Sequence, residues 1–164
     1  MKKAALILGS DSDLPLVQGA LEVFGAYGIP YEKHIYSAHR TPNEAAAFAA
    51  SARENGFGVL IAAAGMAAHL AGALAARTTL PVIGIPLAAG ALQGVDALFS
   101  TVQMPSGIPV ACVGVNGAKN AALLAAEILS LEDENLAEAL RNDREGMRQN
   151  VLAKDSRLNE GPRE

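Results

Sequence analysis

The sequence has little of what several classes of protein depend on. It contains one cysteine, no tryptophan and only 4% aromatic residues among 164. The single cysteine, Cys112, cannot form an internal disulfide, which argues against a small scaffold held together by disulfide bonds. Neither the G-x-G-x-x-G fingerprint of dinucleotide sites nor the GK[ST] ending of a P-loop occurs. Neither a dinucleotide cofactor nor an ATP P-loop is therefore predicted.

The charge balance argues against nucleic acid and anionic membranes as partners. The 13 Lys and Arg residues are outnumbered by 17 Asp and Glu, which gives a net charge of -4. Basic arms are absent, so neither nucleic acid nor an anionic membrane surface is expected as a partner. The first apolar run ends at Gly9, and SDSD follows too early for an export signal. We expect a cytoplasmic protein.

Short strand-like runs alternate with helical segments along the chain. The predicted strands are residues 4–8, 31–36, 59–64, 81–85 and 108–115. The run 31–36 is the most polar and is expected nearer an edge of the sheet. Helices are predicted at 14–27, 42–55, 67–78, 94–102 and 118–131. This alternation is typical of a parallel sheet wrapped by helices, and we expect an α/β, flavodoxin-like doubly wound fold with three α/β/α layers.

The length suits one domain, 1–164, with a core at 3–131, a C-terminal helical extension at 132–155 and a tail at 156–164. Charge is unevenly spread over these parts. Residues from 132 onward hold half of the charged side chains, in a pattern typical of one amphipathic helix. Between residues 56 and 118, Arg77 and Asp96 are the only charged side chains. One small domain cannot bury so long an uncharged span, which predicts contact with other subunits.

Two of the predicted helices have recognisable starts. Asp13 is predicted to cap the first. Thr41, Pro42 and Glu44 form the capping box T-x-x-E, with proline at the first helical position. The preceding residues, SAHR at 37–40, must then be the loop that leads from a strand into that helix.

Polar loops follow the first three predicted strands: GSDSD at 9–13, SAHRTP at 37–42 and AGMAAHLAG at 64–72. In a doubly wound sheet such loops converge outside the carboxyl ends of the strands, where ligands bind. The Ser10 and Ser12 hydroxyls and a helix N-terminus would favour an anion there. Taken alone, however, GSDSD is explained more simply by Asp11 and Asp13 capping a helix.

SAHRTP points more clearly to function. Arg40 offers a charged fork and Ser37 a hydroxyl, the groups that bind phosphate oxygens. A lone arginine after a strand is usually a solvated surface group, but this one shares its turn with His39. Histidine ordinarily titrates near neutral pH, so His39 is the candidate acid and base.

The other histidines and the cysteine have simpler interpretations. His69 lies in a loop of small residues, and a ligand site fits it no better than a helix cap or a core position. His34 lies inside a predicted strand, where a structural role is favoured. Cys112, within PVACVGV, is interpreted as a core residue and not as a nucleophile. The three histidines lack the spacing of metal ligands and no cysteine cluster joins them, so no metal is predicted.

Further segments join these loops in a specific resemblance: AAHL at 67–70, GVDALFSTVQMP at 94–105, GIPVA at 107–111 and AKNAALLAA at 118–126. From Ala4 to about Leu131 the chain resembles the class I family of N5-carboxyaminoimidazole ribonucleotide mutases. These purine-biosynthesis enzymes are also described as the catalytic subunit of phosphoribosylaminoimidazole carboxylase. Two positions depart from the family's commonest pattern, Met66 where glycine is frequent and Ala71 where proline is frequent.

The resemblance implies an isomerase that moves the N5-carboxylate of its substrate to C4 by releasing and recapturing CO2. It implies no ATP, metal or organic cofactor, and a homo-octamer. His39 would be the catalytic acid and base. The substrate-binding residues that it implies are Ser10, Asp13, Ser37, Arg40, Ala64, Gly65, His69 and Leu70.

Within this set, the resemblance implies that Ser10, Asp13 and Arg40 hold the ribose phosphate with help from Ser37. Asp13 would also bind the ribose hydroxyls. The remaining four residues would line the pocket around the base and the carboxylate. One imidazole suffices for a reaction that begins by protonating a carbamate nitrogen and ends by removing a ring proton, since it has no net proton demand.

Two other functions stay open. A class II enzyme of the same type carboxylates aminoimidazole ribonucleotide directly with CO2. That class tends to have lysine after the SAH histidine and to lack AAHL, so Arg40 and His69 favour the mutase. A non-catalytic nucleotide-binding module of the same fold would also suit the loops, but it would need no titrating group where His39 lies.

Overall fold

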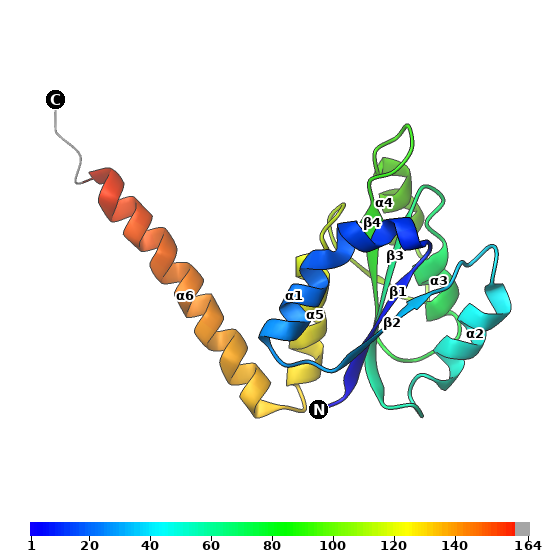
Figure 1. The fold of residues 1–164 in the computed structure, drawn as a ribbon, viewed down its shortest axis with the longest axis horizontal. Coiled ribbons are helices and arrows are strands. Elements are labelled where there is room, and N and C mark those ends of the chain that lie inside the picture. Colours follow the sequence, from blue (N-terminus) through cyan, green and yellow to red (C-terminus); the bar gives the residue numbers. More distant parts are fainter. Residues whose placement is uncertain (160–164) are drawn as a thin grey trace.

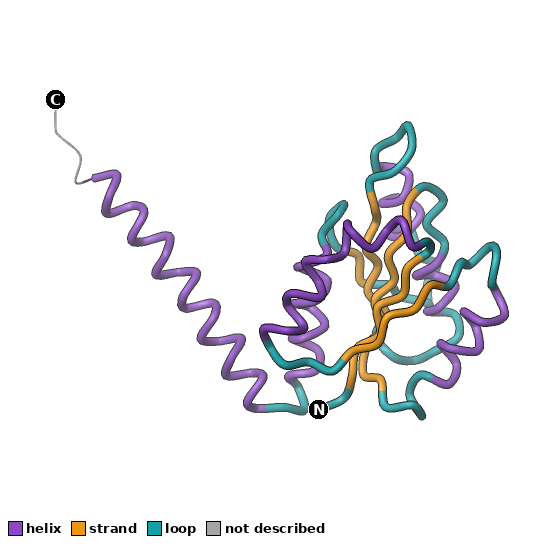
Figure 2. The backbone as a smooth tube through the Cα atoms, viewed as in Figure 1, coloured by secondary structure: helices purple, strands orange, loops and turns teal. Residues whose placement is uncertain are grey.

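A computed structural model describes residues 1–159 and contains one five-stranded sheet in the order β2-β1-β3-β4-β5. The strands are β1 (Lys3–Leu8), β2 (Tyr31–Ile35), β3 (Phe57–Gly65), β4 (Val82–Leu87) and β5 (Ala111–Cys112). Every neighbouring pair is parallel, and β2 lies at an edge. The order and direction confirm the predicted flavodoxin-like doubly wound sheet, and Figure 2 shows it between two layers of helices.

The helices cover both faces of the sheet (Figure 1). They are η1 (Asp11–Val17), α1 (Gln18–Ala26), α2 (Pro42–Ser51), α3 (Leu70–Ala75), α4 (Val95–Val102), α5 (Ala118–Ser130) and α6 (Glu134–Asn159), of which η1 is a 3-10 helix. One face of the sheet is covered by α1 and α5, and the other by α2, α3 and α4. The predicted alternation of strands and helices is therefore correct.

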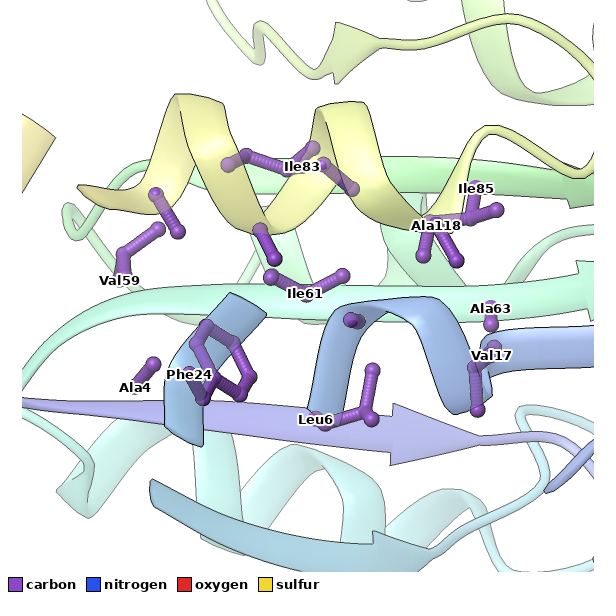
Figure 3. Packing of buried hydrophobic residues seen from close by; sticks show 14 of the residues in the cluster. Ala4, Leu6, Val17, Phe24, Val59, Ile61, Ala63, Ile83, Ile85 and Ala118 are labelled. Atoms are coloured by element: carbon purple, nitrogen blue, oxygen red, sulfur yellow. The ribbon is translucent and has the colours of Figure 1, made fainter. Parts of the chain in front are cut away.

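Small side chains let these layers pack closely. Along each strand the side chains alternate between the two faces, so Leu6, Ile61 and Ile83 all point towards α1 and α5 (Figure 3). From α1, Phe24 fills the space over β1. The face of α5 that meets the sheet is mostly alanine, which brings its backbone close to the strands. A core built this way needs few aromatic residues.

The last predicted strand is much shorter than expected. The prediction covers residues 108–115, but β5 contains only Ala111 and Cys112. Pro109 has no N–H for a ladder bond, and Asn116 turns the chain with a φ of 57°. As an edge strand, β5 pairs only with β4.

Both predicted helix caps differ in detail. Ser10, and not Asp13, is the N-cap of η1, while the Asp13 carboxylate accepts a hydrogen bond from the Ser10 N–H at 3.1 Å. Thr41 is the N-cap of α2, but its side chain caps nothing. Its Oγ1 instead donates to the Ser37 carbonyl at 3.2 Å and accepts from the Ser37 N–H at 2.8 Å. The predicted T-x-x-E box is therefore wrong, because the Thr41 hydroxyl is hydrogen-bonded to the backbone of Ser37 and not to the N-terminus of α2.

The C-terminal segment is one helix, as expected, and α6 continues past the predicted end at residue 155 to Asn159. Residues 160–164 of the predicted tail lie outside the described residues. Figure 1 shows α6 extending away from the rest of the molecule. Its first half is held by Leu136 in the core, by the Tyr27 hydroxyl, which donates to Asp143 at 2.9 Å, and by an ion pair between Arg144 and Glu127. Within residues 1–159 no helix is long and apolar enough to cross a membrane.

Gly84 sets how closely α4 approaches the sheet. A Cβ on this residue of β4 would lie 2.3 Å from Cγ2 of Thr101 and 3.3 Å from the Ala71 side chain. Thr101 is buried and its hydroxyl donates to Ala97 of its own helix, so it cannot easily move. We expect Gly84→Ala to lower the free energy of unfolding by about 1–3 kcal/mol in urea denaturation.

Gly25, inside α1, is the matched control because a Cβ there would meet nothing within 4 Å. Gly25→Ala should leave the free energy of unfolding unchanged or raise it by up to about 1 kcal/mol, because Gly25 lies in the last turn of the helix, where alanine fits without strain. Equal stability of Gly84→Ala and the parent protein would contradict this account of the β4–α4 contact.

Candidate active site

The loops after β1, β2, β3 and β4 enclose one hollow of about 550 Å³ at the carboxyl edge of the sheet. It lies beside β1 and β3, between which the strand order reverses. Every residue predicted for the site lines this hollow: Ser10, Asp13, Ser37, His39, Arg40, Ala64, Gly65, His69 and Leu70. The structure thus brings together side chains that are up to sixty residues apart in the sequence.

The loop after β1 is folded around its own serines. The Ser12 N–H donates to Ser10 Oγ at 3.4 Å and to the Asp11 carboxylate at 3.0 Å, and the two serine hydroxyls are 3.0 Å apart. Partial burial raises the pKa of the Asp13 carboxyl, the Ser10 N–H opposes that rise, and the Asp11 charge adds to it. The N-terminus of η1 is therefore partly satisfied by its own side chains, which weakens it as an anion site.

Arg40 is the only lysine or arginine among the residues that line the hollow. Its Nη2 donates to the Gly9 carbonyl at 3.2 Å, which brings the loop after β2 across the loop after β1. The guanidinium is exposed, and its remaining N–H donors are available to a ligand. Arg40 therefore supplies a permanent positive charge that could hold an anion in this hollow.

Ser37 shapes the turn that carries His39 and Arg40. Its Oγ accepts hydrogen bonds from the N–H of His39 at 3.3 Å and from the N–H of Arg40 at 3.1 Å. With Thr41 bonded to the backbone of Ser37 as well, the turn is closed at both ends. The Ser37 hydroxyl can still donate one hydrogen bond to a ligand.

The two histidines of the site contact each other directly. Nε2 of His39 lies 2.8 Å from Nδ1 of His69, and the ring planes meet at 64°. A hydrogen bond between two imidazoles needs one N–H and one lone pair, so only one ring can be an imidazolium while the contact is kept. Although His69 is at the N-cap position of α3, its side chain makes no capping bond, and it is exposed. The cap and core interpretations of His69 are therefore excluded.

The other candidates lie outside the hollow. Nε2 of His34 contacts Glu32 at 3.2 Å, and its ring stacks on Tyr36 with 5.4 Å between centroids, which fits the predicted structural role. The interpretation of Cys112 as a core residue is wrong, because it is only half-buried in the short edge strand β5. This partial burial raises the pKa of its thiol. Within residues 1–159 no three His, Cys, Asp or Glu side chains are grouped as a metal ion requires.

Sequence reasoning missed Ala89, and it placed Met66 in a pocket loop without predicting its conformation. An alanine side chain has no functional group that would indicate a site. The signal was its position, because Ala89 follows β4, whose carboxyl end lies at this edge of the sheet. A Cβ on Gly65 would lie 2.8 Å from Cβ of Ala89, so the loops after β3 and β4 touch here. Met66 has a φ of 51°, a left-handed conformation that methionine rarely adopts and that its residue type therefore does not predict.

These features define a doubly wound α/β protein with a hollow at the carboxyl edge of its sheet that contains one guanidinium and two contacting imidazoles. Residues 3–150 match the model of the family described as AIR carboxylase, and the chain belongs to this family.

Two curated relatives and one solved structure match this chain over most of their length. The N5-carboxyaminoimidazole ribonucleotide mutase of Pyrococcus abyssi is 53% identical over 90% of this chain and 85% of its own length. The mutase of the same name from Bacillus subtilis is 50% identical over 93% of this chain and 96% of its own. The crystal structure of Treponema denticola PurE superposes with a TM-score of 0.84 at 30% identity, covering 94% of this chain and 97% of that one.

Proposed function

We propose that the protein is an N5-carboxyaminoimidazole ribonucleotide mutase, an isomerase of purine biosynthesis that forms 4-carboxy-5-aminoimidazole ribonucleotide. The relatives named as this mutase, at about half identity over most of both chains, support the reaction. The observation that carries it is the placement of His39, His69 and Arg40 in one hollow. Two contacting imidazoles in the same hollow as a guanidinium suit proton transfer on a phosphorylated substrate.

The proposed roles follow the layout of the loops. Arg40, from the loop after β2, and Ser10, from the loop after β1, bind the ribose phosphate. The Ser37 hydroxyl donates a further hydrogen bond to the phosphate. Asp13 accepts from the ribose hydroxyls, a role that suits a carboxylate better than phosphate contact because like charges repel. The base lies against Ala64, Gly65 and Leu70, next to His69.

The proton transfers balance on one imidazole. The His39 imidazolium gives its proton to N5, the bond between N5 and the carboxyl carbon breaks with its electron pair left on nitrogen, and CO2 is released. C4 then attacks CO2 with the electrons of the amino-substituted ring, which forms the new carbon–carbon bond. Neutral His39 removes the C4 proton, and the aromatic ring and the imidazolium are restored together. Nε2 of His39 and Nδ1 of His69 can share a proton throughout.

No step of this scheme oxidises, reduces or phosphorylates the substrate, so it requires neither ATP nor a redox cofactor. The absence of a metal and the cytoplasmic location stay predictions from the sequence. The test of the function is conversion of the N5-carbamate to the C4-carboxylate by purified protein in metal-free, ATP-free buffer.

Direct carboxylation of aminoimidazole ribonucleotide by CO2 is the second candidate. A relative from Vigna aconitifolia, 47% identical over 93% of this chain but only 27% of its own length, is named as a chloroplastic phosphoribosylaminoimidazole carboxylase. Turnover with aminoimidazole ribonucleotide and CO2 at the rate of the carbamate reaction would favour this candidate. Turnover of the carbamate alone favours the mutase.

We also propose that the protein is a homo-octamer that contacts its copies through α4. The apolar side chains Leu92, Val95, Phe99 and Val102 are 47–60% exposed. The last three share one side of α4 by their spacing, and Leu92 lies in the turn that precedes the helix. This stripe falls within the charge-poor span of residues 56–118. The best-supported partner for it is a second copy of the chain.

Phe99→Asp should therefore reduce the particle mass measured by light scattering at micromolar concentration, because a carboxylate would be buried in the contact. Leu131→Asp is the control, since Leu131 is 85% exposed but lies outside that span. A parent protein that is a stable monomer at this concentration would contradict the prediction.

A further inference from the structure

Met66 combines an unfavourable backbone conformation with an exposed apolar side chain. Its φ of 51° places it in the left-handed region, which glycine adopts freely and methionine does not. Its side chain is also 57% exposed although it is apolar. Exposed apolar residues are common by themselves, but this one combines exposure with backbone strain at the wall of the active-site hollow.

The side chain lies where two loops meet. A Cβ on Gly90, in the loop after β4, would lie 3.4 Å from both Cγ and Sδ of Met66. One residue earlier, Gly65 approaches Ala89 of the same loop. The thioether thus lies against the junction of the loops after β3 and β4, and Met66 and Ala89 both line the hollow.

The backbone of Met66 begins the turn that places His69. The Ala68 N–H donates to the Met66 carbonyl and the His69 N–H donates to the Ala67 carbonyl, both at 2.8 Å. These two tight turns bring the chain to His69, whose ring reaches His39. Glycine at position 66 would make the same turn without strain, so the turn alone does not account for a methionine.

We propose that Met66 is a substrate-contacting residue whose thioether covers the imidazole ring of the bound ribonucleotide and closes the hollow towards solvent. A polarisable sulfur packs well against an aromatic ring, and covering by the ligand removes apolar surface from water. The cover also slows the escape of CO2 between its release from N5 and its capture by C4. This inference rests on the proposed mutase reaction.

Three variants separate the side chain from the turn. Met66→Ala removes the thioether but keeps the strain, Met66→Gly removes both, and Met66→Leu keeps apolar bulk. Met147→Ala is the control, because Met147 is 50% exposed on α6, outside the site.

Two measurements are made on each protein. The first is the affinity for aminoimidazole ribonucleotide by calorimetry. The second is the fraction of 13C that passes from labelled N5-carbamate into the C4-carboxylate in unlabelled bicarbonate buffer with carbonic anhydrase. We expect Met66→Ala and Met66→Gly to bind about 5–20-fold more weakly and to lose label to the buffer. Met66→Leu should stay near the parent in both measurements.

The inference is wrong if Met66→Gly keeps the affinity and label retention of the Met147→Ala control, whatever Met66→Ala does. In that case the thioether contributes to neither measurement, and residue 66 acts only through the backbone turn. If the parent itself does not convert the carbamate, the proposed reaction fails, and the affinity comparison alone then decides the role of Met66.

Discussion

Replacement of His39 by asparagine is expected to lower turnover of the N5-carbamate by about 10²–10⁴-fold. Asparagine keeps approximate size and hydrogen bonding but cannot carry a proton between N5 and C4. Its amide is too short to keep the contact that Nε2 of His39 makes with His69, but the turn around Ser37 uses only the backbone N–H of residue 39. Nucleotide affinity, measured by calorimetry, should therefore stay close to that of the parent.

His34→Asn is the matched control, because His34 contacts Glu32 on β2 and does not line the hollow. Its turnover should equal that of the parent. If His39→Asn converts the carbamate within a few-fold of the parent between about pH 6 and 8, where imidazole titrates, the proton carrier is another group. His69 would then be the next candidate, and His69→Asn in the same assay would identify it.

The position of the site could be predicted from the sequence because the fold determines it. Once five strands alternate with helices, the residues after β1, β2 and β3 must gather at one edge of the sheet, whatever the details of each loop. His39 and Arg40 were therefore placed in the hollow by the strand before them and the helix after them. The same argument places the loop after β4 at this edge too, but nothing in an alanine marks Ala89 as part of a site.

Contacts within the loops could not be predicted in the same way. Asp13 and Thr41 are good capping residues by type, but each has a competing partner a few residues away. Which partner is bonded depends on backbone angles that propensity does not fix. The contact between His39 and His69, thirty residues apart, depends on the left-handed Met66 and on the turns that follow it. Such conformations arise from packing between loops and leave little trace in the residue pattern.

Arg40→Ala is expected to lower the affinity for aminoimidazole ribonucleotide by about 10–100-fold, the effect of losing hydrogen bonds to a charged group. The structure strengthens this prediction, because Arg40 is the only lysine or arginine among the described residues that line the hollow. The corresponding nucleoside has no phosphate, so its affinity should hardly change. The ratio of the two affinities, measured by calorimetry, is the quantity that reports on the phosphate contact.

Arg53→Ala is the matched control, because the Arg53 guanidinium is exposed, donates to Thr79 and does not line the hollow. Its ratio of nucleotide to nucleoside affinity should equal that of the parent. Ser10→Ala should change the ratio less than Arg40→Ala, since the Ser10 hydroxyl already donates to Asp11. Because Arg40 also bonds to the Gly9 carbonyl, a displaced loop would weaken nucleotide and nucleoside alike. An Arg40→Ala protein with an unchanged ratio would place the phosphate elsewhere, and the loop after β1 would lose its proposed role with it.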